Sequence, residues 1–354
     1  MRKKNFIHIC NLDKFIPPFI DFVEKHFDFE NHLFYIWGDI NNYPLKRRSN
    51  IRLLSERRGK VGILLGLLEI LFASIKADKI IFHGLFNIRV ILLFFFFPWL
   101  LKKGYWIIWG GDLYQYKQRN LNYKARIKEY FRKHVIRNMG FLVVNISGEV
   151  ELCRKWYNAE GKHINIFTYP SVLFREIHHE AEDNHSLYIL VGNSANPTNN
   201  HAKIFEIIKH YKDKNIKIYC PLSYGNQEYA NEIVDKGKAC FGDKFFPLLK
   251  FIEFDNYMRL LAKIDIAVFA HDRQQAMGNT ITLLGMGKKV HMNPDTTSYQ
   301  HFCELGIKVF TLEEFSLNKD FPERRKNIEI IKNFYSQERL IQNLSILFGL
   351  QAKY

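Results

Sequence analysis

Strand-like and helix-like segments alternate along nearly the whole chain, and this alternation limits the possible folds more than any other feature. In the first half, short apolar runs at residues 6–10, 32–37 and 79–82 are separated by longer segments of helical spacing. Parallel strands need a crossover of helix length between them, so this pattern is typical of parallel sheets. The sequence therefore predicts an α/β protein.

The alternation is interrupted by the polar stretch at residues 175–185 and restarts with an apolar run at 187–191. A chain of 354 residues is long enough for two domains. We therefore expect two Rossmann-like, parallel-sheet domains facing a cleft. The expected parts are a first domain at residues 1–170, a linker at 171–186, a second domain at 187–325, and a C-terminal helix at 326–354 that packs back across the domains.

Several individual segments carry their own expectations. The apolar segments at residues 61–75 and 88–101 are too short to span a membrane, and both are predicted to be core helices. The second could instead offer Phe and Trp side chains to a bilayer interface. We also expect a short strand at 250–252 and one amphipathic helix at 326–347.

The positive charge is concentrated in the first half of the chain. The whole chain has 51 Lys/Arg and 36 Asp/Glu, and residues 1–170 hold 28 of the cations against 14 of the acids. This half is therefore expected to meet an acidic partner such as anionic lipid or a phosphorylated acceptor, although a general role in solubility is the alternative. No RNA-binding pattern is present, so nucleic acid is not expected as a partner.

The cysteine and histidine patterns argue against a structural metal or a disulfide framework. The five cysteines are scattered without a CxxC pair, which suits a reducing cytoplasm. The chain contains no Asp-x-Asp, and its histidines form no HxxxH-type cluster. We therefore expect no cofactor and no metal. The first residues also lack the apolar stretch of a signal peptide.

Two loops of the second half could hold a nucleotide diphosphate. A run of small residues, Gly192, Asn193 and Ser194, follows the strand-like run 187–191 and precedes a helix, where backbone N–H groups favour anions. The loop after the strand at 266–270 offers a cation for the diphosphate and polar groups beside a glycine. Its candidate residues are Arg273, Gln274, Gln275, Gly278, Asn279 and Thr280. Phe254 could pack against the base.

Two loops of the first half could carry the acid–base chemistry. His83 follows one strand and Asp112 follows another, each beside glycine. Activation of a sugar hydroxyl needs one positioned base, and Asp112 is the first candidate and His83 the second. The alternatives are a buried, hydrogen-bonded histidine and a helix-capping aspartate.

The segment at residues 117–137 contains eight Lys/Arg and one acidic residue. Its apolar positions follow helical spacing between basic flanks, which is typical of a helix on an anionic membrane surface. The cations expected to contact the membrane are Lys124, Arg126, Lys128, Arg132 and Lys133. A helix packed on the sheet with a solvated basic face is the alternative.

Several sequence blocks, in this order, resemble glycosyltransferase family 56. They are FHGLFN (82–87), WIIWGGDLY (106–114), ILVGNSANPTNNH (189–201), CPLSYGNQEY (220–229), and the run from FIEFDNY to QQAMGNT (251–280). The resemblance implies that Tyr224 belongs to the donor side, and that Asn87, Trp109 and Tyr114 belong to the acceptor side.

The resemblance also implies a GT-B fold and an inverting transfer of an amino-deoxysugar, 4-acetamido-4,6-dideoxygalactose (Fuc4NAc), from a dTDP-sugar. The implied acceptor is a saccharide linked to undecaprenyl diphosphate, as in enterobacterial common antigen synthesis. The implied location is the cytoplasmic face of the bacterial inner membrane, as a peripheral enzyme. Glutamates of the general GT-B donor signature are replaced by Gln274 or Gln275 and by Thr282, which suits a deoxyribose.

Other readings of the same residues stay open. The chain could serve O-antigen or another surface polysaccharide with a different sugar. It could be a GT-B transferase with a UDP- or GDP-sugar donor and another acceptor. It could also be a basic membrane- or nucleic-acid-binding protein without activity, which would bind no nucleotide through the second half.

Overall fold

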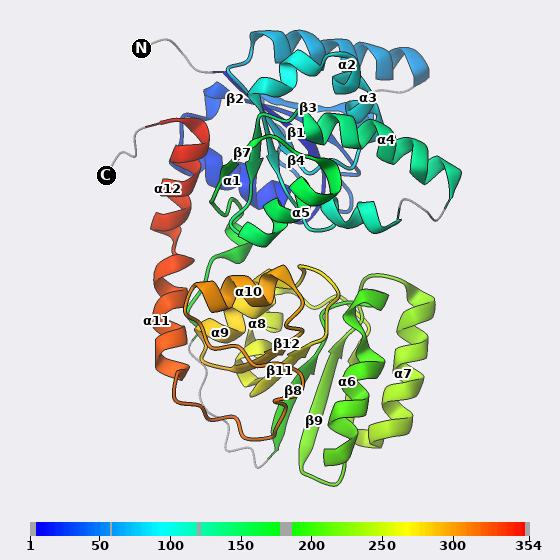
Figure 1. The fold of residues 1–354 in the computed structure, drawn as a ribbon, viewed down its shortest axis with the longest axis vertical. Coiled ribbons are helices and arrows are strands. Elements are labelled where there is room, and N and C mark those ends of the chain that lie inside the picture. Colours follow the sequence, from blue (N-terminus) through cyan, green and yellow to red (C-terminus); the bar gives the residue numbers. More distant parts are fainter. Residues whose placement is uncertain (1–4, 57–58, 119–121, 178–185, 351–354) are drawn as a thin grey trace. The chain divides into compact units, whose positions relative to one another are not determined.

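The computed structural model of the chain describes residues 5–56, 59–118, 122–177 and 186–350. The chain forms two compact units, Met1–Ser171 with Gln337–Tyr354 and Val172–Ser336. Each unit is built on one parallel β-sheet with helices on its faces (Figure 1). Residues 178–185, which make up part of the expected linker, lie outside the described residues.

The first unit contains a seven-stranded sheet in the order β3-β2-β1-β4-β5-β6-β7, and all its strand pairs are parallel. Its strands are β1 (Phe6–Asn11), β2 (His32–Trp37), β3 (Ile51–Leu53), β4 (Lys79–His83), β5 (Gly104–Ile107), β6 (Phe141–Val143) and β7 (Lys162–Ile164). Its helices are α1 (Ile16–His26), α2 (Gly59–Lys76), α3 (Ile88–Phe96), α4 (Tyr123–Arg137), α5 (Ser147–Tyr157) and α12 (Gln337–Phe348).

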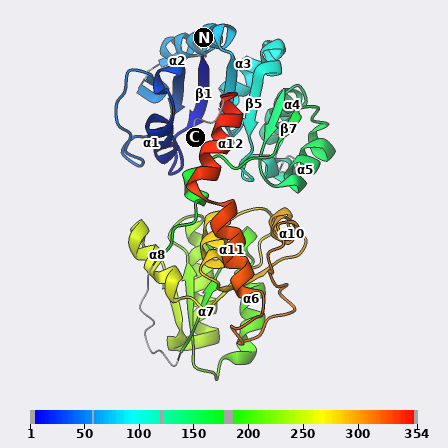
Figure 2. The same cartoon turned by 90° about the vertical axis from the view of Figure 1, so that its left-hand side faces the viewer.

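Alternate side chains of the strands fill the cores on the two faces of this sheet. One face carries Ile7, Ile9 and Phe82, which pack with the buried sides of α2, α3, α4 and α5. The other face carries His8 and is covered by Phe19 of α1 and Phe348 of α12. Figure 2 shows α12, drawn in red, in front of the sheet on this second face. A sheet buried on both faces explains why its strands read as continuous apolar runs.

The second unit contains a five-stranded parallel sheet in the order β10-β9-β8-β11-β12. Its strands are β8 (Leu187–Val191), β9 (Ile216–Pro221), β10 (Phe245–Leu248), β11 (Ile266–Phe269) and β12 (Lys289–Met292). Its helices are α6 (His201–Ile208), α7 (Gln227–Phe241), α8 (Phe254–Lys263), α9 (Met277–Gly285), α10 (Thr297–Glu304) and α11 (Arg324–Phe334). Helices α6 and α7 cover one core of this sheet, in which Phe205 and Phe241 are buried.

Three expected elements differ from the structure. The strand expected at 250–252 lies earlier, as β10, whose Phe245 is buried against Phe205. The apolar segment 88–101 is not one helix, because α3 ends before Pro98, and Pro98–Lys103 forms a 3-10 segment. The single helix expected at 326–347 is instead α11, in the second unit, and α12, in the first.

Candidate functional site

The order of the strands locates the edge of the second sheet at which a ligand is expected. The chain runs from β8 outward to β9 and β10, and then returns to place β11 on the other side of β8. In open parallel sheets, ligands bind outside the carboxyl ends of the two strands where the order reverses. The loops after β8 and β11 are those that contain Gly192–Ser194 and Arg273–Gln275, so the fold brings the two predicted donor loops to one place.

The loop after β8 is organised around the buried side chain of Asn199. The Asn193 backbone N–H donates to Asn199 Oδ1 at 2.9 Å, and Asn199 Nδ2 donates to Ser194 Oγ at 3.2 Å. Gly192 has a φ of +65°, and a Cβ there would lie 2.5 Å from His201 Nε2. A glycine is therefore required at this position both for conformation and for space.

The two donor loops are joined to each other by side-chain hydrogen bonds. Gln275 Nε2 donates to Asn193 Oδ1 at 3.3 Å, and Thr198 Oγ1 donates to Gln275 Oε1 at 2.8 Å. From the loop after β9, the Tyr224 hydroxyl accepts a hydrogen bond from Asn193 Nδ2 at 2.8 Å. The network gives the edge a fixed polar surface made by three loops.

The start of α9, with the positive end of its helix dipole, lies at the same carboxyl edge of the second sheet. Ala276, which precedes the helix, has a φ of +57°, and among the described residues no side chain caps the first turn of α9. Arg273 lies in the loop before α9, four residues ahead of Met277, and its Nη1 donates to the carbonyl oxygen of Gln274 at 3.1 Å. Backbone N–H groups at an uncapped helix start, with a cation in the preceding loop, suit an anion such as a diphosphate.

Three predicted donor residues near α9 and α8 have internal partners. The Thr280 hydroxyl is buried and donates to the carbonyl oxygen of Ala276, which argues against its expected bond to a phosphate. Asn279 Nδ2 donates to the Tyr257 hydroxyl at 2.8 Å, while Gly278 lies half-buried in the first turn of α9. Phe254 is half-exposed at the start of α8, with the Arg175 guanidinium 5.3 Å from its ring centroid.

In the first sheet the strand order reverses between β1 and β4. The residue of interest after β1 is Asp13, a half-buried carboxylate whose Oδ1 accepts a hydrogen bond from the Phe15 backbone N–H at 2.8 Å. Burial raises the pKa of Asp13 to about 6, although the N–H bond from Phe15 and the nearby Lys14 lower it. Asp13 was not predicted from the sequence, and the available signal was a carboxylate two residues after the first strand.

Asp112 is fully buried, and both of its carboxylate oxygens are occupied. Oδ1 accepts from the backbone N–H groups of Trp109 (2.9 Å) and Leu113 (2.8 Å). Oδ2 accepts from the Leu85 backbone N–H (2.9 Å) and from Trp106 Nε1 (2.7 Å). Burial raises the pKa of Asp112, whereas the nearby Arg132 and these N–H groups lower it. Because Asp112 accepts four internal hydrogen bonds, it holds the loop of Leu85 and the loop of Trp109 together. This structural role argues against its expected role as the base.

Arg132, expected on a membrane-facing surface, is instead fully buried next to Asp112. Its Nη1 donates to the carbonyl oxygen of Leu85 at 2.7 Å, its Nη2 donates to the carbonyl oxygen of Asp112, and its Nε lies 3.1 Å from Glu129. A side chain with no exposed surface cannot contact lipid. The burial of Arg132 could not be predicted from helical spacing, because the sequence alone does not show which side of α4 faces the sheet.

His83, the second candidate base, belongs to a buried chain of hydrogen bonds. Trp109 Nε1 donates to the Tyr169 hydroxyl at 2.8 Å, so that this hydroxyl can donate in turn to His83 Nδ1 at 2.6 Å. His83 Nε2 contacts His8 Nδ1 at 3.0 Å, and His8 Nε2 contacts His32 Nδ1 at 2.9 Å.

This chain of bonds leaves His83 a poor proton acceptor. Burial lowers the pKa of His83 and of His32 to about 3, and burial together with its two histidine neighbours lowers the pKa of His8. All three imidazoles are therefore neutral near pH 7, and both ring nitrogens of His83 have partners. This geometry argues against His83 as the base that activates a sugar hydroxyl.

The remaining residues expected on the acceptor side have different surroundings. Asn87 caps α3 by accepting from the Arg89 backbone N–H at 3.0 Å. Tyr114 is buried, and its hydroxyl donates to Glu149 at 3.1 Å. Trp109 is half-buried beside Phe15, with ring centroids 5.5 Å apart. On α4, the side chains Lys124, Arg126 and Lys133 are exposed and Lys128 is half-buried.

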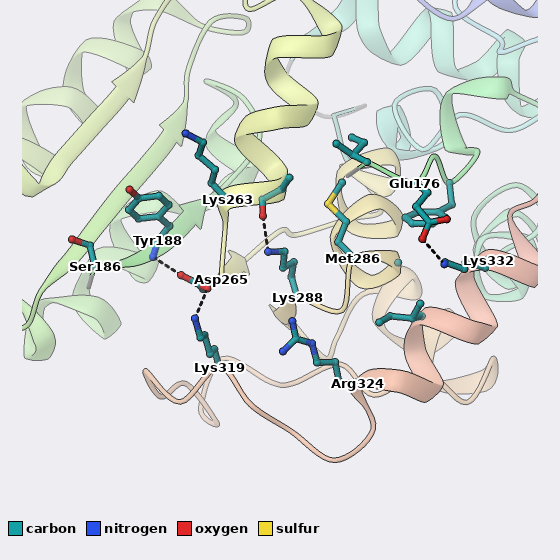
Figure 3. Close-up of a pocket in the computed structure, with 15 residues that line it drawn as sticks. Glu176, Ser186, Tyr188, Lys263, Asp265, Met286, Lys288, Lys319, Arg324 and Lys332 are labelled. Carbon is teal, nitrogen blue, oxygen red and sulfur yellow. Dashed lines mark hydrogen bonds and ion pairs between the residues drawn. The ribbon is translucent and has the colours of Figure 1, made fainter. Parts of the chain in front are cut away.

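A basic cavity of about 480 Å³ opens at the opposite, amino-terminal edge of the second sheet (Figure 3). Its lysines already have internal partners. Lys288 Nζ donates to the carbonyl oxygen of Ala262 at 2.6 Å, and Lys319 lies 3.0 Å from Asp265. Lys332 pairs with Glu176 at 2.8 Å. Because parallel sheets bind ligands at their carboxyl edge, the donor is not assigned to this cavity.

Among the residues that the structure describes, no group of three or more His, Cys, Asp or Glu side chains is arranged to hold a metal ion. Metal independence stays a prediction.

Solved structures share the two-unit architecture over nearly the whole chain. Anabaena HepE in complex with UDP and glucose matches with a TM-score of 0.65 and 11% identity, covering 98% of this chain and 100% of that one. The structure of trehalose-6-phosphate from Escherichia coli bound with UDP-2-fluoro glucose matches with a TM-score of 0.62 and 9% identity, covering 99% of this chain and 100% of that one. A putative UDP-N-acetylglucosamine 2-epimerase from Listeria monocytogenes matches with a TM-score of 0.55 and 13% identity, covering 100% and 99%.

These likenesses show the fold, which is the GT-B arrangement of two Rossmann-like, parallel-sheet units. The sequence itself matches the family described as 4-alpha-L-fucosyltransferase, glycosyl transferase group 56, over residues 68–332. That range contains both donor loops and the loop that holds Asp112. Because the match spans most of the chain, the protein belongs to glycosyltransferase family 56.

Proposed function

We propose that this glycosyltransferase moves an amino-deoxysugar, Fuc4NAc or a close relative, from a dTDP-sugar to a saccharide linked to undecaprenyl diphosphate. The observation that carries the proposal is the joined pair of donor loops at the reversal point of the second sheet, with Arg273 in the loop before the uncapped start of α9. The product would be a lipid-linked intermediate of enterobacterial common antigen, O-antigen or a related surface polysaccharide.

The donor edge suits a diphosphate leaving group without a metal. As the bond between the sugar and the β-phosphate breaks, negative charge builds on the phosphate oxygens. The N–H groups of the first turn of α9 and the Arg273 guanidinium stabilise that charge because they are fixed in place before the reaction. Phe254 offers a half-exposed aromatic face for the thymine base.

We assign the general base to Asp13 rather than to Asp112 or His83. Its pKa of about 6 leaves it ionised at neutral pH yet more basic than an ordinary carboxylate. Asp13 takes the proton of the acceptor hydroxyl while that oxygen bonds to the anomeric carbon and dTDP departs. A single displacement of this kind inverts the anomeric configuration.

The acceptor would bring the enzyme to a membrane as a peripheral protein, on the cytoplasmic face of the inner membrane. The exposed cations Lys124, Arg126 and Lys133 of α4 support this location, because anionic lipid attracts such a face. A second candidate is a transferase with a UDP-sugar donor. It is favoured by the UDP in the HepE complex, which shares the fold.

Nucleotide binding tests the donor class directly. We expect dTDP to bind more tightly than UDP or GDP in calorimetry, and to bind equally well with EDTA or with magnesium. Stronger binding of UDP or GDP would overturn the dTDP assignment but not the family. Binding of none of the three would favour a protein without transferase activity, and a requirement for magnesium would contradict metal independence.

Arg273→Ala should weaken dTDP binding by about 1.5–3 kcal/mol, the usual contribution of a hydrogen bond to a charged group. The expected reason is loss of the cation beside the diphosphate, so binding of thymidine should be unaffected. Calorimetry with dTDP and with thymidine measures both. Arg325→Ala serves as the control, because Arg325 is exposed on α11 and pairs only with Glu329 among the described residues. Unchanged dTDP affinity would remove Arg273 from this role.

A further inference from the structure

Helix α2 carries a stripe of large apolar side chains on its outer side. Its members are Val61, Leu64, Leu65, Leu68, Phe72 and Ile75, with exposed fractions from 39% at Leu68 to 71% at Val61. At 3.6 residues per turn, these six positions fall within an arc of about 100° around the helix axis. We call this set the α2 stripe.

The α2 stripe plays no part in the core of the first unit. Of the buried residues of α2, Gly66, Ile70 and Ser74 lie on the side opposite the stripe, and Leu71 lies beside it. A helix at the surface of a soluble protein normally turns polar residues outward at the positions that the stripe occupies. Contiguous apolar surface of this kind marks a site of association with a protein or a membrane.

The neighbouring helices carry further exposed aromatic side chains. Helix α3 packs against both α2 and α4, so the three form one layer (Figure 1). Phe96 of α3 and Tyr130 of α4 are exposed, and the ring of Phe95 joins them at centroid distances of 5.3 and 6.4 Å. Trp99, in the 3-10 segment after α3, is also exposed.

The charges around this layer favour a lipid surface as the occupant. Lys60 and Lys76 are exposed at the two ends of α2, and Lys102 is exposed beyond Trp99. On α2 the single acid, Glu69, contacts Arg52 at 3.6 Å and the Tyr35 hydroxyl at 3.4 Å. Long cations and Trp or Tyr rings at the border of an apolar face are typical of interfacial helices. A second copy of this chain would instead bring like-charged borders together.

We propose that α2 lies in the plane of a bilayer and inserts the α2 stripe below the headgroups, so that apolar insertion supplies most of the membrane affinity. Among the described residues, no helix is long and apolar enough to cross a membrane. The inference rests on the proposed lipid-linked acceptor for its biological purpose, but it makes a separate physical claim. Insertion persists on neutral lipid and at high salt, whereas attraction through the cations of α4 alone does not.

The test is sedimentation of the full-length protein with vesicles of pure phosphatidylcholine at about 0.5 M salt, where electrostatic attraction is screened within a few Å. Wild-type protein is expected to bind. Leu65→Gln, Leu68→Gln and Phe72→Gln together are expected to lower the partition coefficient roughly a hundredfold, because three inserted apolar side chains are lost. The matched control is Phe246→Gln, Leu249→Gln and Ile346→Gln together, which removes three exposed apolar side chains elsewhere and should bind like wild type.

The outcomes separate this inference from the proposed function. Binding that needs anionic lipid and vanishes at high salt would overturn insertion by α2. A wild-type dimer that the stripe substitutions convert to monomer, with no vesicle binding by either form, would assign the stripe to a second copy and also overturn it. Both triple variants should keep wild-type dTDP affinity. Vesicle binding as expected in a protein that binds no nucleotide would support the α2 stripe while refuting the proposed transfer reaction.

Discussion

Asp13→Asn is expected to lower kcat by a factor of about 10²–10⁴ while leaving dTDP affinity unchanged, because an amide cannot accept the proton of the acceptor hydroxyl. The substitution preserves size, and the amide oxygen can keep the 2.8 Å bond from the Phe15 N–H. In the wild-type enzyme, kcat/KM should fall about tenfold per pH unit below a pKa near 6, as Asp13 becomes protonated. Radiochemical transfer assays across this pH range measure both effects.

The control and the stability of the variant make this prediction specific. Asp39→Asn is a matched control, because Asp39 Oδ1 also accepts a backbone N–H two residues ahead, from Asn41 at 2.9 Å, and Asp39 is exposed. A folded-state pKa raised above the unfolded value means that Asp13 favours folding below about pH 4 and loses that contribution as pH rises through about 6. Asp13→Asn should therefore be at least as stable as wild type at pH 8. Normal turnover, or an unchanged pH profile, would exclude Asp13 as the base.

Asp112→Asn is expected to destabilise the first unit by about 3–5 kcal/mol, because it replaces a buried carboxylate that accepts four N–H bonds and lies near Arg132. An asparagine amide would point its own N–H groups at two of those donors and leave the guanidinium less well compensated. Urea unfolding followed by tryptophan fluorescence measures the effect, since all five tryptophans lie in the first unit.

The same variant distinguishes a structural role from a chemical one. Asp39→Asn should unfold at the wild-type urea concentration, because its carboxylate is exposed. An Asp112→Asn protein that is as stable as wild type, binds dTDP and does not turn over would return the base role to Asp112. Loss of stability together with partial activity in the folded fraction would support the structural role.

The alternation of short, strand-like apolar runs with segments of helical spacing was sufficient to predict both parallel sheets. Residues 187–191, for example, are β8 as expected, because five apolar or aromatic residues bounded by a polar stretch and a glycine leave few other options. The break between α11 and α12 was not visible in the amphipathic pattern. It depends on tertiary contacts of Tyr335, whose carbonyl oxygen accepts from the Phe174 N–H at 3.1 Å and whose hydroxyl contacts His301 at 2.9 Å.

The site was predicted less completely than the fold, for a physical reason. Loops at the ends of β8 and β11 could be paired because both follow buried strands and carry small polar residues. The importance of Asp13 depends on β1 lying beside β4, and the order of strands is set by packing rather than by local sequence. Burial of Arg132 and exposure of the α2 stripe likewise depend on which side of a helix meets the sheet. Helix α2, which is apolar on nearly every side, gives no periodic signal for that choice.

The path of the chain through the two units has a consequence for how the protein is made. Most of the first unit comes from residues before 172, but α12, which covers part of its sheet, comes after residue 336. The ribosome therefore synthesises the whole of the second unit before the sheet of the first unit can be fully covered. Until then Phe6 and His32 lack the ring of Phe348, and Lys79 Nζ lacks the carbonyl oxygen of Leu347, which it meets at 2.6 Å. The second unit is continuous in sequence and can close first. The earliest-translated strands are therefore among the last to be fully covered, and their apolar side chains stay partly exposed during synthesis.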